Sequence, residues 1–131
     1  MNTELGGQIF LDRRRRVMRN VMDETQVKKM LVIAEYVFRN EDMSVSIGTK
    51  HAQSNELTVL IAGGRIEYNS FKHRRDAWDV AIKFNLYVKK LEDGMYEAGT
   101  HDVKDERTVV SVSPTVAVSE MAFLILFENN Q

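Results

Sequence analysis

Cysteine is absent from this chain of 131 residues. Its absence excludes disulfide bonds, a cysteine nucleophile and cysteine metal ligands, and it is typical of proteins from a reducing compartment. Proline is almost as scarce, with Pro114 the single example, which argues against a long disordered linker. We therefore expect a single domain over residues 1–131, with residues 1–8 as a loose tail.

The sequence also shows no pattern typical of a secretion signal or a membrane-spanning helix. The N-terminus carries its basic run, Arg13 to Arg16, after a very short apolar run, and this is the wrong order for a signal peptide. The most apolar stretch is Val116 to Phe127, where ten of twelve residues are apolar. A membrane-spanning helix needs about 20 such residues. We therefore expect a cytoplasmic protein.

The apolar stretch predicts a buried C-terminal helix from Pro114 to about Glu128. Ser113 is a good N-cap and Pro114 suits the first helical position. Helical spacing of apolar residues predicts three more helices, over 9–22, 24–39 and 73–84. In the helix at 73–84, the expected buried side consists of four residues: Ala77, Trp78, Ala81 and Ile82.

Between the helices the pattern is typical of short strands. Alternating or β-rich segments predict strands over 43–47, 57–62, 66–68, 86–91, 95–100 and 108–112. Gly63-Gly64 and Asp93-Gly94 are turn signals, and the second is the strongest hairpin signal in the chain. The predicted fold class is α+β. It has two N-terminal helices, then a mainly antiparallel sheet with two further helices, of which the C-terminal one is buried.

Catalytic and metal-binding patterns are not recognisable in the sequence. The three histidines lack the paired spacing of a metal site, and no Lys-Ser or Lys-Thr follows Gly63-Gly64 as a phosphate loop requires. We therefore predict a protein that is not an enzyme, with no catalytic residues, no metal and no cofactor.

Charge is unevenly distributed although the net charge is only −1. Residues 63–91 carry seven basic and three acidic side chains, whereas residues 92–131 carry two basic and eight acidic ones. This asymmetry suggests an acidic surface for a basic partner, which we assign to Asp102, Asp105 and Glu106. A second candidate is the apolar pair Val32 and Tyr36, which is either covered by another element or presented to a partner.

Two alternatives use the basic segments. A nucleic-acid-binding protein would contact phosphates through its arginine-rich N-terminal helix, at Arg13, Arg15, Arg16 and Arg19. The cluster Lys72 to Arg75, with Lys89 and Lys90, lies at a helix N-terminus that favours anions, although a structural use explains it more simply. A homo-oligomeric structural protein would instead join the basic face of one copy to the acidic face of another.

Three short motifs carry a resemblance to a known group of proteins. They are Asp76-Ala77-Trp78, the run Asp93-Gly94-Met95-Tyr96-Glu97-Ala98, and Ser113-Pro114 opening an apolar helix. From Asp76 to Phe127 the chain resembles the C-terminal part of small accessory proteins of unknown role from tailed phages and prophages, of the NinX-like kind. The resemblance implies a phage protein in the host cytoplasm that binds a host protein. An inhibitor of a defence system such as CRISPR is one form of this expectation.

Overall fold

The computed structural model describes residues 24–49, 53 and 55–129. Within these residues the chain forms three helices rather than the predicted four, and only one of the three is N-terminal. The helix predicted over 9–22 lies outside the described residues. The helices are α2 (Glu24–Val37), α3 (Arg74–Phe84) and α4 (Pro114–Asn129). The strands are β1 (Val45–Thr49), β2 (Leu57–Ile61), β3 (Ile66–Tyr68), β4 (Leu86–Lys90), β5 (Tyr96–Thr100) and β6 (Thr108–Ser111).

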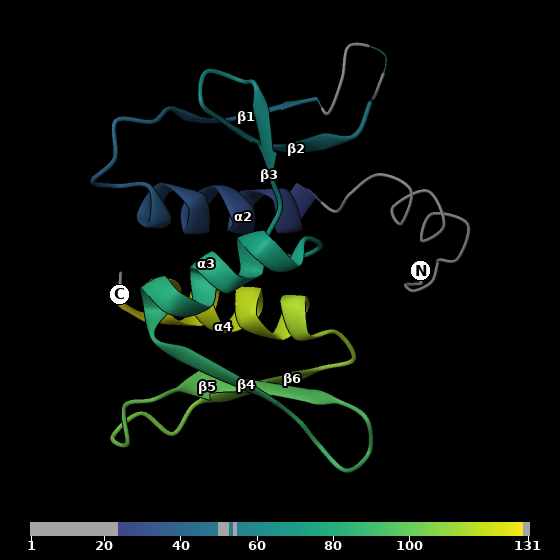
Figure 1. The fold of residues 1–131 in the computed structure, drawn as a ribbon, viewed down its shortest axis with the longest axis vertical. Coiled ribbons are helices and arrows are strands. Elements are labelled where there is room, and N and C mark those ends of the chain that lie inside the picture. The colour runs from purple at the N-terminus through teal and green to yellow at the C-terminus, as the bar shows by residue number, and fades with distance from the viewer. Residues whose placement is uncertain (1–23, 50–52, 54, 130–131) are drawn as a thin grey trace, which may run out of the picture.

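The α+β class is confirmed, but the strands form two sheets and not one. Strands β1, β2 and β3 make one antiparallel sheet, and β4, β5 and β6 make the other. In Figure 1 the three helices lie between these two sheets. In the described residues, a helix followed by a three-stranded meander thus occurs twice, and α4 completes the chain.

The backbone angles confirm the predicted turns. Ala62, Gly63 and Gly64 all have positive φ between β2 and β3, and Gly94 has φ of 87° between β4 and β5. Asn85 has left-handed backbone angles, φ 59° and ψ 52°, and ends α3 as predicted. Each of these residues belongs to a type that tolerates positive φ, except Ala62.

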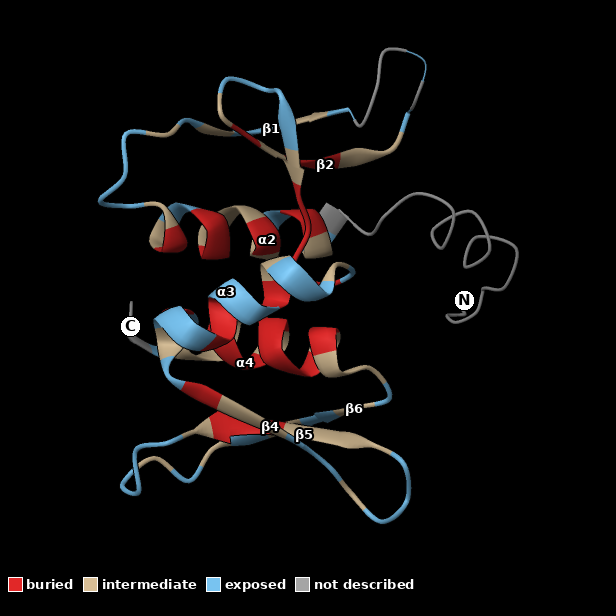
Figure 2. Ribbon diagram, in the orientation of Figure 1, coloured by how far each residue is buried: buried red, intermediate tan, exposed pale blue. Residues whose placement is uncertain are grey.

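Helix α4 is the centre of the packing, as the sequence predicted. It contacts α2 and α3 on one side and all three strands of the second sheet on the other. Ala117, Met121 and Ala122 are fully buried. Figure 2 shows buried residues in red along much of α4. Towards its C-terminal end the burial is incomplete, because the Phe127 side chain is 52% exposed.

Helix α2 joins the first sheet to the rest of the molecule. It packs on β1 and β2 and also on α3 and α4, so that a broad face is buried. Met30, Ile33 and Ala34 are fully buried on this face. The Lys29 ammonium group lies 2.9 Å from a Glu120 carboxylate oxygen, which adds an ion pair between α2 and α4.

The turn between β3 and α3 is the polar junction of the core. The Ser119 hydroxyl donates to Ser70 Oγ across 2.8 Å, and the Thr115 hydroxyl donates to the carbonyl oxygen of Phe71 across 2.7 Å. The amide N–H of Asn69 donates to the Asp76 carboxylate at 2.9 Å. These bonds satisfy polar groups that burial would otherwise leave without partners, and they fix the start of α3 against α4.

Candidate functional site

The outer face of α3 carries the most conspicuous exposed apolar side chains of any helix in the described residues. Trp78 and Ile82 are each 64% exposed, one helical turn apart. The sequence prediction that both belong to the buried side of α3 is therefore wrong. Figure 2 shows this helix with an exposed face turned to the viewer and its buried residues towards α4.

The buried side of α3 is instead formed by Ala77, Val80 and Ala81, with Phe84 partly buried beyond them. These four positions follow the spacing i, i+3, i+4, i+7 of a helix face. The signal was therefore present in the sequence. The larger Trp78 and Ile82 side chains led to the prediction of the other side, because the sequence does not show which side of α3 the neighbouring elements cover.

Trp78 borders a hollow of about 450 Å³ between α3, β4 and the start of α4. Its walls are almost entirely apolar. The lining residues are Arg74, Arg75, Ala77, Trp78, Ala81, Val88, Pro114, Thr115 and Val118. We call Trp78, Ile82 and these lining residues the α3 surface. The small side chains of Ala77 and Ala81 leave the space, and Trp78 forms one wall of it.

Arg74 and Arg75 give the hollow a cationic end at the first turn of α3. Both side chains are exposed, and neither forms an ion pair with any residue that the structure describes. His73, the N-cap residue, makes no side-chain capping hydrogen bond, so its side chain leaves the first N–H groups of the helix uncapped. The two guanidinium groups and the positive end of the helix dipole therefore both favour an anion at this end of the hollow.

Asp76 lies in the same first turn but serves the fold. Its carboxylate accepts from the Asn69 N–H, and its carbonyl oxygen accepts from the Tyr68 hydroxyl at 3.2 Å. Desolvation raises the pKa of Asp76 above its ordinary value, although the Asn69 hydrogen bond and the nearby His73 and Arg75 oppose the shift. Burial likewise raises the pKa of Tyr68, and the charges of Asp76 and Asp79 add to that shift.

The second basic cluster predicted from the sequence is divided by the fold. Lys89 follows Val88 on β4, so its side chain points to the opposite face of the sheet from the hollow. There its ammonium group lies 3.8 Å from Glu97 and 6.0 Å from the centre of the Tyr87 ring. Of the cluster, Arg74 and Arg75 line the hollow, whereas Lys72, His73, Lys89 and Lys90 do not.

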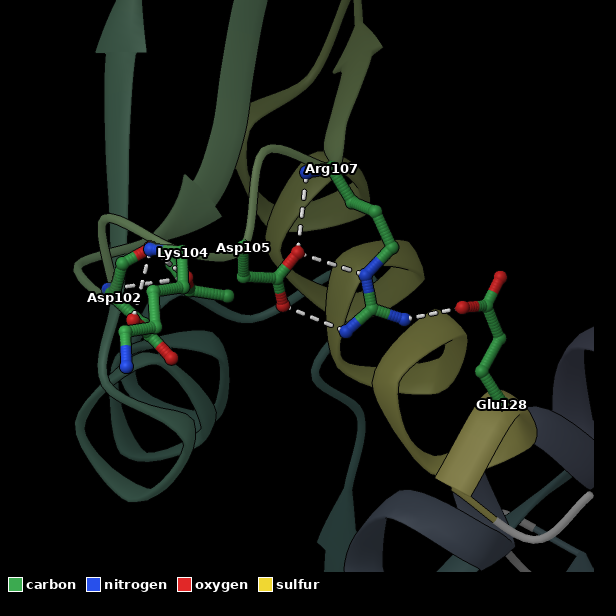
Figure 3. Close-up of polar contacts among 6 residues, drawn as sticks. Asp102, Lys104, Asp105, Arg107 and Glu128 are labelled. Carbon is green, nitrogen blue, oxygen red and sulfur yellow. Dashed lines mark hydrogen bonds and ion pairs between the residues drawn. The ribbon is translucent and has the colours of Figure 1, made fainter.

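The predicted acidic surface lies on the loop between β5 and β6, and one of its members is engaged within the chain. Asp105 accepts two hydrogen bonds from the Arg107 guanidinium group, at 2.9 and 2.6 Å, and Arg107 also bonds Glu128 of α4 (Figure 3). The Arg107 hydrogen bonds lower the pKa of Asp105 to about 2. Asp102 is exposed and accepts from the Lys104 N–H, and Glu106 is exposed.

The predicted apolar pair on α2 is half-buried in the structure. The Tyr36 ring lies 4.6 Å from the Phe84 ring between centroids, and the Arg39 guanidinium group lies 4.6 Å from the same tyrosine ring. Val32 is half-buried against the core. Both side chains are partly covered within the molecule, and contact of this pair with a partner stays a prediction. Arg13, Arg15, Arg16 and Arg19 lie outside the described residues.

No group of three or more histidine and acidic side chains within residues 24–49, 53 and 55–129 has a geometry that could hold a metal ion. His101 instead packs against the Tyr87 ring, 5.9 Å between centroids. In the described part of the chain, every helix is too short or too polar to cross a membrane. The chain matches no family model, no curated protein and no solved structure.

Proposed function

We propose that this protein is a non-enzymatic accessory protein that binds another protein through the α3 surface. The observation that supports the proposal is the exposure of Trp78 and Ile82 beside an apolar hollow. An exposed tryptophan on a rigid helix is costly to leave in water, and tryptophan and arginine are enriched among residues that dominate binding energy in protein interfaces. Trp78, Arg74 and Arg75 bring both types together.

The kind of partner follows from the resemblance to NinX-like phage proteins. We expect a host protein, and inhibition of a host defence system such as CRISPR is the outcome that this origin favours. The acidic loop is a second contact region in this proposal, through Asp102 and Glu106. Asp105 contributes less because its carboxylate is held by Arg107.

A protein partner suits the α3 surface better than nucleic acid. Platforms for single-stranded nucleic acid combine a basic groove with successive aromatic rings, whereas Trp78 is the only aromatic residue in this lining. Ile82 extends the apolar surface along α3 beyond the hollow, which enlarges the area that an apolar partner surface would bury.

The proposal is tested by affinity capture from host lysate after nuclease treatment, followed by mass spectrometry. The test variant combines Trp78→Ala and Ile82→Ala. The control combines Ile66→Ala and Val103→Ala, which remove two exposed apolar side chains elsewhere, 52% and 91% exposed. We expect the test variant to lose a stoichiometric protein that the wild type and the control retain. Equal capture by all three chains would refute binding through α3.

A parallel capture tests the acidic loop. Asp102→Lys with Glu106→Lys reverses two exposed charges and leaves the Asp105–Arg107 pair intact. Loss of the same partner with this variant would place the loop in the interface. Unchanged capture would confine the interface to other surfaces.

A further inference from the structure

We infer that the partner segment that occupies the α3 surface is an acidic amphipathic helix, an inference that rests on the proposed function. The first step is the shape of the hollow. Arg74, Arg75, Trp78 and Ala81 place it along the length of α3, and Pro114 and Val118 of α4 face them across it. Grooves between helices are where amphipathic helices dock, with apolar residues at helical spacing as anchors.

The second step is the size and the lining. A volume of about 450 Å³ is in the range of sites that take several apolar groups at once. Small residues, Ala77 and Ala81, form the α3 side, so that large aliphatic side chains of a partner would fill the space. Trp78 and Ile82 stand one turn apart beside it and would pack against the same partner face.

The third step is charge. Two lysine side chains near the helices have acidic neighbours within the chain: Lys29 has Glu120, and Lys89 has Glu97. Arg74 and Arg75 have none within salt-bridge distance among the described residues. Asp76, the nearest carboxylate in sequence, is committed to the Asn69 N–H. A carboxylate from the partner would therefore complement two guanidinium groups and the uncapped end of α3.

Trp78 also supplies the measurement, because it is the only tryptophan in the chain. A ligand that fills the hollow removes water from its indole ring, so the emission shifts to shorter wavelength. The probe is a synthetic helix of about 16 residues, roughly four turns, with leucines along one face and glutamates beside them. Matched peptides replace every glutamate by glutamine, or scramble the order so that the amphipathic face is lost.

We expect the glutamate helix to bind the full-length chain about tenfold more tightly than the glutamine helix. This preference should decline as salt increases, because exposed charges are screened. Arg74→Glu with Arg75→Glu should remove the preference, whereas the matched charge reversal Lys83→Glu with Lys104→Glu should keep it. The scrambled peptide should not shift the Trp78 emission.

Equal affinity for the glutamate and glutamine helices, or unchanged affinity in the Arg74→Glu/Arg75→Glu variant, would overturn the acidic-helix inference. A single-stranded oligonucleotide that quenches Trp78 in an arginine-dependent manner, with no peptide effect, would overturn it in favour of nucleic acid. The proposed function has a separate readout. If the captured partner needs Trp78 and Ile82 but ignores the arginine reversal, protein binding stands and the acidic-helix inference fails.

Discussion

The hydroxyl group of Ser119 on α4 donates to the hydroxyl oxygen of Ser70 across 2.8 Å, and neither side chain has any exposed surface. The two residues are 49 positions apart in sequence. A single short bond between them therefore ties the turn before α3 to the central helix. This polar contact lies inside an apolar core, where an unpaired hydroxyl is unfavourable.

Replacing both of these serines should destabilise the protein by less than the sum of the two single replacements. Ser119→Ala leaves the Ser70 hydroxyl without this partner, and we expect a loss of about 1–3 kcal/mol in the free energy of unfolding. Ser70→Ala with Ser119→Ala should cost less than the sum of the single changes. Urea denaturation of the four chains gives the coupling energy. Strict additivity would show that the hydroxyl groups do not depend on each other.

Asp76 should make stability depend on pH in the direction opposite to an ion-paired carboxylate. Burial raises its folded-state pKa above the ordinary 3.8, so the folded protein binds the proton more tightly than the unfolded chain does. The contribution of Asp76 to the free energy of unfolding is therefore fully present below pH 3.8 and is lost as pH rises through the folded-state pKa. Asp76→Asn removes the titration, and its side-chain oxygen still accepts from the Asn69 N–H. We expect the free energy of unfolding of Asp76→Asn, relative to wild type, to increase between pH 3 and pH 7 as measured by urea denaturation. A flat difference would contradict the raised pKa.

Asp105 should show the reverse dependence. Arg107 holds its folded-state pKa at about 2, below the ordinary 3.8, so its contribution is present above 3.8 and is lost as pH falls towards 2. Asp105→Asn should therefore lower the thermal midpoint at pH 6 but have little effect near pH 2. Asp102→Asn is the control on the same loop, since its oxygen still accepts from the Lys104 N–H. If the two variants lowered the thermal midpoint equally at pH 6, the contact between Asp105 and Arg107 would not be the source of the stabilisation.

The exposed face of α3 should tolerate truncation, whereas the buried face of α4 should not. Trp78→Ala with Ile82→Ala removes large exposed side chains and should change the free energy of unfolding by no more than about 0.5 kcal/mol at each site. Met121→Ala, in the fully buried wall of α4, should cost about 2–5 kcal/mol. Both values come from denaturant unfolding monitored by circular dichroism, which does not depend on Trp78. A large loss in the α3 variant would mean that its outer face is covered.

Local structure followed the sequence closely where the decisive interactions are between near neighbours. The turn at Gly63-Gly64, the hairpin at Asp93-Gly94 and the left-handed Asn85 all depend on backbone angles that only a few residue types tolerate. The start of α4 at Pro114 is equally local, because the carbonyl and hydroxyl oxygens of Ser113 accept from the first turn. These features needed no knowledge of the rest of the chain.

The number of sheets and the exposed face of α3 were decided only by tertiary structure. Strand periodicity shows which residues share a face, but not which strands pair, so two three-stranded sheets could not be distinguished from one. Helix α3 is apolar on two sides, and α4 and β4 bury the side with Ala77, Val80 and Ala81 because small residues allow close approach. Trp78 and Ile82 therefore remain exposed, because the neighbouring elements pack against the opposite side of the helix.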